Sequence, residues 1–301
     1  MEEANSSEKV VRDSFCNKFT VVKEIAASKF PVFLIDCSET KRKLVLKLFP
    51  YENDKPSLSY LNESRFIFLD HPSIISFKHI QKFQRTRYRK EKIYCSYIIM
   101  EYASNGDFKK FVEHFSGLRD ERLVRTYFHQ LIEGIEYLHS KGVAHMDIKL
   151  ANLLLDGDYM LKIADFDNAY IEGDWNILGR GTKNYRAPEL KKDTCTDAFA
   201  TDIYSAGIVL FNLLTGCLPY NEDHVIEDAS LLDLLREDLS LYWERLSRYG
   251  ISLSEDAQEL FTSMVRADPV ERATLAEVKS SKWYSGEIYT KEQLRKLCLR
   301  L

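Results

Sequence analysis

The spacing of apolar residues changes about one third of the way along the chain. Up to Met100, apolar residues form short β-rich runs separated by turn-like residues, a pattern typical of strands. The predicted strands cover 19–22, 32–35, 43–48, 74–77 and 94–100. A single helix is predicted among them, over 57–69. The first third is therefore predicted to be a sheet that carries one helix.

After Asn105 and Gly106 the apolar positions follow the period of a helix. They recur every three or four residues at Leu123, Tyr127, Phe128, Leu131, Ile132, Ile135 and Leu138. Further helical patterns cover 202–214, 231–246, 256–266 and the basic stretch 291–301. A strand-rich part followed by a helix-rich part predicts two lobes with a cleft between them. Residues 1–17 are small and charged, which predicts a loose tail.

Composition narrows the class of protein. Hydrophobic residues make up 45% of the chain and charged residues 29%, as in ordinary globular proteins. The net charge is −4, whereas nucleic-acid-binding proteins usually carry an excess of basic residues. We therefore expect no nucleic-acid partner. The first 20 residues are polar, which predicts no signal peptide. The longest apolar run, 208–214, is broken by Asn212 and is shorter than the roughly 18 residues of a membrane span, so we expect no membrane partner.

The cysteines argue against metal binding or redox chemistry. None of the six forms a C-x-x-C pair, and they lie at Cys16, Cys37, Cys95, Cys195, Cys217 and Cys298. Scattered cysteines of this kind favour reduced thiols, so we expect a cytoplasmic or nuclear protein.

One short segment concentrates the chemistry. Asp147, Lys149 and Asn152 follow His145 within eight residues, and a predicted strand then leads to Asp165. A carboxylate can orient a hydroxyl nucleophile, a lysine can offset charge on a moving phosphoryl group, and Asn and Asp oxygens can hold magnesium. The alternative for Asp147 is a capping or turn aspartate. The segment predicts phosphoryl transfer.

The order of these residues resembles that of the protein-kinase family, over about 19–284. The resemblance implies an α+β, bilobal protein-kinase fold with a β-rich N-lobe and a larger helical C-lobe. It implies a kinase domain at 18–284, divided into lobes at about 18–102 and 103–284, with a flexible tail at 1–17 and a C-terminal helical tail at 285–301. It also implies that ATP binds with Mg²⁺ or Mn²⁺, with Asn152 and Asp165 as the metal ligands.

The same resemblance assigns residues to the nucleotide. Lys47, at the end of an apolar run, would bind phosphate and pair with Glu63, although the spacing from Glu63 to His71 is one residue shorter than usual. The alternatives are a lysine at an apolar edge and an exposed helix glutamate. Met100 would be the gatekeeper, the backbone of Glu101 and Ala103 would bond adenine, and Asp107 would reach the ribose. The remaining implied nucleotide contacts are Ile25, Phe30, Phe33 and Leu154.

Further landmarks resemble the part of the family that receives protein substrates. Lys149, two residues after the catalytic Asp147, is typical of kinases that act on serine and threonine. In the segment 181–189, Thr182 would bond Asp147 and Lys149, and Glu189 would form a buried ion pair with Arg272. Asp202 resembles the aspartate that braces the catalytic loop.

Three segments depart from the family pattern, at five positions. Ala26, Ser28 and Pro31 stand where three glycines usually cover the phosphates, and Pro31 has no N–H to donate. Met146 replaces the arginine before the catalytic aspartate, and 165–181 contains no Ser or Thr. We therefore expect activity that does not depend on phosphorylation of this segment. Asp167 replaces a glycine beside Asp165, which restricts φ.

We predict a monomeric, ATP-dependent protein serine/threonine kinase in which Asp147 and Lys149 act on the transferred group. The rival from another class is an inactive pseudokinase that serves as a binding or scaffold module, and a second rival is a small-molecule kinase. The basic stretch 78–92 is either a docking site for a partner or a solvated hairpin tip.

Overall fold

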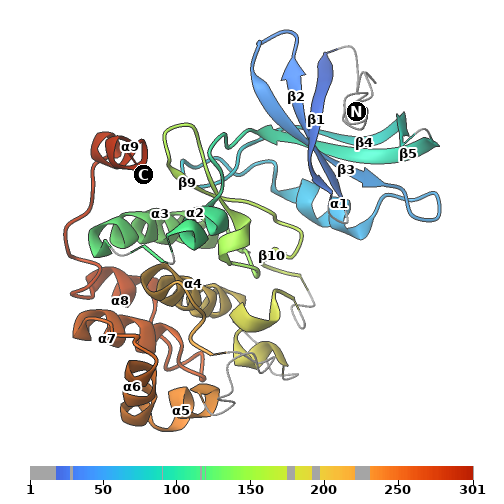
Figure 1. The fold of residues 1–301 in the computed structure, drawn as a ribbon. Helices are drawn as coiled ribbons and strands as arrows, with labels where there is room; N and C mark the ends of the chain where they lie inside the picture. Colours follow the sequence, from blue (N-terminus) through green and yellow to red (C-terminus); the bar gives the residue numbers. More distant parts are fainter. Residues whose placement is uncertain are drawn as a thin grey trace, which may run out of the picture. The chain divides into compact units, whose positions relative to one another are not determined.

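A computed structural model describes most of the chain (Figure 1). The described residues are 18–27, 30–89, 91–115, 117–118, 120–174, 180–191, 197–220 and 231–300. They divide into two compact units, one of Met1–His71 with Ile75–Tyr102 and one of Pro72–Ile74 with Ala103–Leu301. Unit 1 is mainly a sheet and unit 2 is mainly helical, which confirms the predicted α+β class. The predicted tail 1–17 lies outside the described residues.

Unit 1 contains a five-stranded antiparallel sheet in the order β1-β2-β3-β5-β4. Its strands are β1 (Phe19–Ala27), β2 (Pro31–Cys37), β3 (Lys43–Pro50), β4 (Phe77–Tyr88) and β5 (Glu91–Glu101). Apolar residues on one face of the sheet form a buried cluster, because side chains alternate between the faces of a strand. The cluster consists of Val21, Phe33, Ile35, Leu46, Leu48, Cys95, Tyr97 and Ile99.

The predicted helix 57–69 is shorter in the structure. Helix α1 (Leu58–Glu63) begins after Ser57, whose hydroxyl accepts a hydrogen bond from the Tyr60 N–H at 3.2 Å. After Glu63 the chain tightens into a 3-10 turn (Ser64–Phe66). The serine cap was readable from the sequence as a start signal, but the early change to 3-10 geometry was not.

The region 74–92 corrects one prediction. The strand expected at 74–77 begins only at Phe77, and Ile74 instead forms an isolated parallel bridge with Ile163. Most basic residues of 78–92 lie along β4 and β5, and Arg89 lies in the turn between these two strands. Strand β4 is an edge of the sheet, and its pairing with β5 is shifted between Gln81 and Gln84 by a bulge.

Unit 2 is built from helices and short strand pairs. The strands are β6 (Gly106–Asp107), β7 (Val143–Ala144), β8 (Leu153–Leu155), β9 (Leu161–Ile163) and β10 (Tyr170–Ile171). The helices are α2 (Phe108–His114), α3 (Glu121–Ser140), α4 (Ala198–Thr215), α5 (Leu231–Glu237), α6 (Leu239–Arg248), α7 (Glu255–Met264), α8 (Leu275–Ser280) and α9 (Lys291–Cys298). The strands pair as β6-β8-β9 and as β10-β7, and these two small sheets position the candidate site.

Side-chain caps set the ends of these helices. The Asp120 carboxylate accepts hydrogen bonds from the N–H groups of Arg122 and Leu123 at the start of α3. Helix α4 begins after Asp197 in the same way and ends at Gly216, whose φ of +78° suits a glycine. The expected single helix 231–246 is two helices, because the Asp238 side chain caps α6 by accepting from the Leu241 N–H.

Helix α4 is the central helix of unit 2. In the part of the chain that the structure describes, it is the one helix long and apolar enough to cross a membrane by length and composition. The apolar run 208–214 covers only part of the apolar length of this helix. Of this helix 72% is buried inside the protein, as is usual for a core helix of a folded domain, so it is weak evidence for a membrane span.

A buried ion pair joins two distant segments of unit 2. The Arg272 guanidinium donates to both Glu189 carboxylate oxygens, at 2.6 and 2.9 Å, and also to the backbone carbonyls of Ala200 and Arg266. Both side chains are buried. Because every donor and acceptor finds a partner, the pair tolerates burial that would be costly for either charge alone.

We predict that Arg272→Met lowers the free energy of unfolding by about 3–5 kcal/mol, because it leaves the Glu189 carboxylate buried without its partner. The matched control is Lys279→Met, which removes the half-exposed ion pair of Lys279 with Glu136 at 2.8 Å. That change should cost less than about 1 kcal/mol. Urea denaturation measures the free energy of unfolding of both variants. An equal loss of this free energy in Arg272→Met and Lys279→Met would contradict the prediction.

Candidate active site

The part of the candidate site in unit 1 is centred on Lys47. Its ammonium lies 2.6 Å from Oε2 of Glu63, which is the last residue of α1 and is only 1% exposed. The shorter spacing between Glu63 and His71 therefore does not prevent the ion pair. Burial strengthens such a charge pair, since water does not screen it.

Strand register decides which predicted residues share the face of Lys47. Met100 pairs with Val45, two residues before Lys47, so the side chain of Met100 lies on the Lys47 face. Phe33 pairs with Leu46 and packs into the buried cluster of the sheet, on the opposite face. The register therefore does not support the predicted contact of Phe33 with the nucleotide. Val32, which pairs with Lys47, takes that face instead.

The loop that lacks glycines leaves an aromatic ring beside the lysine. Phe30 is buried, and its ring packs against Phe49 with centroids 4.8 Å apart. The Lys47 ammonium lies 6.0 Å from the centroid of the Phe30 ring. Ser28 lies outside the described residues, and Ile25, at the bulge of β1, is 40% exposed. Phe30 therefore packs against the face on which a phosphate would meet Lys47.

The predicted adenine-binding backbone has partners of its own. The Glu101 N–H donates to the Ser76 carbonyl at 2.9 Å, and the Glu101 carboxylate accepts from the Ser76 N–H at 2.8 Å. In unit 2, the Ala103 carbonyl accepts from the Gly106 N–H at 3.1 Å. These bonds hold both residues in place, and their roles toward adenine remain predictions.

Two further predicted nucleotide residues meet on the small sheet of unit 2. Asp107 of β6 pairs with Leu154 of β8, so the two side chains share a face. Leu154 is half-buried, whereas Leu153 and Leu155 on either side are fully buried. The Asp107 carboxylate caps α2 by accepting from the Lys109 N–H at 2.8 Å. One oxygen therefore has a structural role before any ligand binds.

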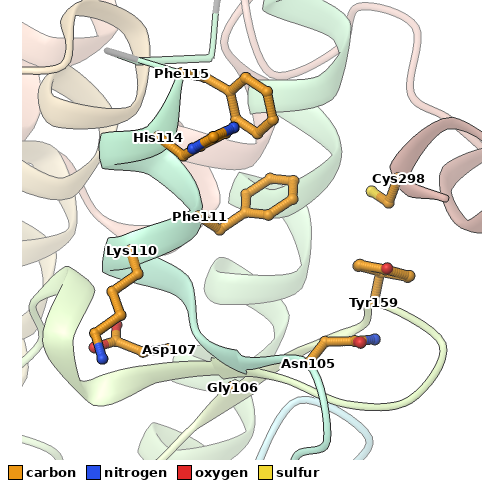
Figure 2. Close-up of a pocket in the computed structure, with 9 residues that line it drawn as sticks. All are labelled: Asn105, Gly106, Asp107, Lys110, Phe111, His114, Phe115, Tyr159 and Cys298. Atoms are coloured by element: carbon orange, nitrogen blue, oxygen red, sulfur yellow. The ribbon is translucent and has the colours of Figure 1, made fainter. Parts of the chain in front are cut away.

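Asp107 also lines a cavity of about 580 Å³ on the surface of α2 (Figure 2). The aromatic rings of Phe111, Phe115 and Tyr159 contribute to its wall, and Cys298 of α9 contributes from the other side. Asp147, Lys149, Asn152 and Asp165 are absent from the residues that line it. The cavity is therefore separate from the predicted chemistry.

The catalytic segment gathers its polar side chains around the Asp147 carboxylate. Oδ1 accepts from the backbone N–H and the hydroxyl of Thr182, at 2.8 and 2.7 Å. Oδ2 accepts from the Lys149 ammonium at 2.8 Å and from the Asn152 amide at 3.1 Å. The Lys149 ammonium also donates to the Thr182 hydroxyl at 2.6 Å. Asp147, Lys149, Asn152 and Thr182 are thus brought together as the sequence predicted.

The backbone of this loop is strained at Met146. Met146 has a φ of +64°, which is unusual for a residue other than glycine. The buried Asp202 carboxylate holds the strain by accepting from the N–H groups of His145 and Met146, each at 2.8 Å. The His139 ring donates to the same carboxylate at 3.0 Å. Strain of this kind persists only where the surrounding structure enforces it.

Asn152 and Asp165 offer oxygen atoms suited to a hard divalent cation. The Asn152 amide nitrogen donates to the Asp147 carbonyl and carboxylate. The side-chain oxygen of Asn152, Oδ1, is then the atom of that side chain that can accept or bind a cation. The Ala164 N–H donates to the Asn152 carbonyl at 2.9 Å and so ties the residue before Asp165 to this segment. One amide and one carboxylate suit Mg²⁺, which keeps waters and takes further oxygens from phosphates. Within the described ranges, His, Cys, Asp and Glu form no cluster of three or more that could hold a metal.

The residue in place of the family glycine lies in an ordinary turn. Asp167 is the second residue of a turn closed by the Ala169 N–H and the Phe166 carbonyl at 3.1 Å, and it is not among the residues with positive φ. The left-handed position is taken by Asp165, with a φ of +67°. The turn therefore accommodates Asp167 without strain at that residue.

The segment 181–189 packs closely on the catalytic loop. Gly181 has a φ of +85°, and a Cβ there would collide with the Met146 carbonyl oxygen. This glycine lets Thr182 reach Asp147. Burial raises the pKa of Tyr185 to about 12, so its phenol stays neutral near Asp147. Sequence reasoning missed Arg180, whose guanidinium donates to the carbonyls of Asn168 and Ala169 at 3.1 and 2.7 Å.

Comparison with known proteins identifies the family of this site. Residues 29–284 match the family model described as the protein kinase domain. The chain belongs to the protein kinase family. The sheet of unit 1 and the helices of unit 2 accordingly form the bilobal α+β fold of protein kinases.

Individual relatives point to the serine/threonine branch of this kinase family. The chain is 34% identical over 236 residues to the probable serine/threonine-protein kinase KCC4 of Saccharomyces cerevisiae. The aligned region covers 76% of this chain and 21% of the relative. It is 37% identical over 202 residues to the CBL-interacting serine/threonine-protein kinase 8 of Arabidopsis thaliana, covering 66% of this chain and 42% of the relative. The kinase thus spans less than half the length of these curated relatives.

We predict a KM for ATP well above the low micromolar range, because Pro31 has no N–H to offer the phosphates and Phe30 packs beside Lys47. Pro31→Gly restores the N–H and the backbone freedom, and should lower the KM by about fivefold, the value of one hydrogen bond near 1 kcal/mol. Pro31→Ala, which restores only the N–H, separates the two effects. A low-micromolar KM in the unaltered protein would contradict the prediction.

Proposed function

We propose that this chain is an ATP-dependent protein kinase that phosphorylates serine and threonine. The observation that carries the proposal is the arrangement around Asp147, whose carboxylate is bonded by Lys149, Asn152 and Thr182. A carboxylate held in this way can accept the proton of a substrate hydroxyl as that hydroxyl attacks phosphorus. Lys149, within 2.8 Å of it, supplies a positive charge for the transferring phosphoryl group.

The cofactor would be ATP with Mg²⁺ or Mn²⁺. Lys47, oriented by Glu63, would bind the α- and β-phosphates, and Asn152 and Asp165 would hold the metal through their oxygens. The bound metal would neutralise charge on the phosphates. Leu154 and Asp107, which share a face of their small sheet, would contact the base and the ribose. Phosphoryl transfer depends mainly on positioning and electrostatics, which these fixed side chains can supply.

The rival proposal is a pseudokinase, and two observations favour it. Pro31 cannot donate to a phosphate, and the buried Phe30 ring packs beside Lys47. Against it, Asp147, Lys149, Asn152 and Thr182 are bonded to one another, and Lys47 is bonded to Glu63. Asp167 adds no backbone strain at its own position, which removes one reason to doubt activity.

We also propose that activity does not depend on phosphorylation between Asp165 and Gly181. Met146 packs in an apolar cluster with Ala144, Leu190 and Ala198, where an arginine would have bound a phosphate. Arg180, near the end of the segment 165–181, donates to the carbonyls of Asn168 and Ala169 near its start. This guanidinium therefore ties the two ends of the segment together. Both observations support an anchor that needs no phosphate, although 175–179 lie outside the described residues.

Protein substrates and a docking partner are further proposals. Some relatives of the chain are named CBL-interacting kinases, and this name describes a binding partner of those relatives. For this chain we propose that the basic residues of the β4–β5 hairpin form a docking surface for a partner. A monomer in the cytoplasm or nucleus remains our expectation.

The decisive test is transfer of radiolabelled phosphate from ATP to a generic basic protein. Asp147→Asn should reduce the rate by about 10²–10⁴-fold, because the amide cannot accept the proton. The control is Asp158→Asn, which removes the surface ion pairs with Lys291 and Arg295. Equal labelling by the unaltered protein and Asp147→Asn would end the active-kinase proposal.

A second test concerns regulation. Phosphatase treatment should leave activity unchanged, because the segment is held by Met146 and Arg180. Met146→Leu should retain activity, whereas Met146→Arg should lose it, since the guanidinium would enter an apolar cluster without a partner. Loss of activity on phosphatase treatment, traced to Tyr170 or another site between Asp165 and Gly181, would refute the proposal.

A further inference from the structure

One face of the β4–β5 hairpin combines exposed aromatic rings with a group of positive charges. Arg85 pairs with Tyr94 and Arg87 pairs with Lys92 across the two strands, so these four side chains lie on the same face. All four are exposed, whereas the alternate residues Gln84, Thr86, Tyr88 and Ile93 are half-buried. The hairpin therefore has a packed face and a solvent face, and its cations lie on the latter.

Three aromatic rings continue this solvent face toward the bulge of β4. Phe83 is 54% exposed and stacks on Tyr94, which is 43% exposed, with centroids 5.3 Å apart. Tyr51 meets the other side of this pair, with its centroid 5.9 Å from that of Phe83. We call Tyr51, Phe83, Arg85, Arg87, Lys92 and Tyr94 the basic aromatic patch.

The positive charges of this patch repel one another. Within the described residues, no carboxylate lies within ion-pair distance of Arg85, Arg87 or Lys92. Arg87 and Lys92 are direct cross-strand neighbours, and like charges at such positions destabilise a sheet. An acidic ligand would remove this repulsion, so the patch is complementary to negative charge.

The edge of β4 is poorly suited to an added strand. At its bulge the Lys82 carbonyl bonds inward, where it accepts from the hydroxyls of Tyr51 and Ser96 at 2.7 and 2.6 Å. The bulge between Gln81 and Gln84 interrupts the regular ladder, and bulges and lysines protect edge strands from pairing. A partner is therefore expected on the solvent face of the hairpin rather than along its edge.

We propose that the basic aromatic patch binds an acidic peptide segment of a protein partner, with one apolar side chain on Phe83. Residues two apart on a strand are separated by about 7 Å, so Arg85 and Arg87 follow Phe83 at about 7 and 13 Å. An extended peptide fits this spacing when acidic residues stand two and four positions from its apolar anchor. The proposal rests on the docking role proposed for this hairpin and identifies the chemistry of its partner.

A nucleic acid is the less favoured occupant. The rings of Phe83 and Tyr94 already stack on each other, and the Arg85 guanidinium lies 6.0 Å from the centroid of the Tyr94 ring. Bases would need those ring faces for stacking. The net charge of −4 for the chain also repels an extended polyanion, whereas a short acidic peptide meets only the local cations.

Fluorescence anisotropy with the full chain tests the proposal. The probe is a labelled decapeptide that carries one Phe and Glu residues two and four positions after it. Phe83→Ala and Arg87→Glu should each weaken binding by about tenfold or more, as expected for a central anchor and a charge reversal. Binding should weaken further as salt is raised. The matched controls are Tyr249→Ala, an equally exposed aromatic of unit 2, and Lys23→Glu, an exposed cation of β1.

The outcomes separate this proposal from the catalytic one. Phosphorylation of a short generic peptide should be unchanged in Phe83→Ala, and Asp147→Asn should bind the probe as tightly as the unaltered protein. Absence of probe binding, or equal affinity in the patch variants, would overturn the proposal. A single-stranded oligonucleotide that binds more tightly than the peptide, and is lost in the same variants, would overturn it in favour of a nucleic-acid site.

Discussion

The buried Asp202 carboxylate supports the candidate site from the core of unit 2. It lies on α4 and accepts three hydrogen bonds, from the N–H groups of His145 and Met146 and from the ring of His139. These bonds hold Met146 in a left-handed conformation that an isolated chain would rarely adopt. The turn at Met146 in turn directs Asp147 toward Lys149, Asn152 and Thr182. The geometry of the site therefore depends on the packing of α4, which supplies rigidity through burial.

The replacement of arginine by Met146 has a consequence for this arrangement. An arginine with the same backbone would bring a charged group that needs a counterion, and the segment would be ordered only when a phosphate is present. Met146 instead contacts apolar residues and makes a sulfur contact with the Thr201 hydroxyl at 3.2 Å. Apolar contact does not switch with modification. This difference is the physical basis for the proposed independence from phosphorylation.

Much of this was predictable from sequence because the chemistry lies in short segments. Asp147, Lys149 and Asn152 stand within six residues, so one loop brings them together whatever the rest of the fold does. The ion pair of Lys47 with Glu63 and that of Glu189 with Arg272 were also predicted, from the order of motifs along the chain. The face of Phe33 was not predictable in the same way, because a single-residue change of register turns a strand residue to the other face of the sheet. Arg180 was missed because its partners are backbone carbonyls, which carry no sequence signal.

Aromatic contacts within unit 1 connect the glycine-poor loop to the basic aromatic patch. Phe30 lies on the face of the sheet that carries Lys47, and its ring is buried against Phe49, which also contacts Tyr60 of α1 at 5.6 Å. Phe49 in β3 is followed within two residues by Tyr51 of the patch, whose ring contacts Phe83. A contiguous path of aromatic contacts and backbone therefore runs along one face of the sheet, from Lys47 to the basic aromatic patch. Such a path is only spatial, and coupling requires that a ligand at the patch change the packing of Phe30. The affinity of ATP measured with and without the acidic peptide would express that coupling as a free energy, equal in both directions.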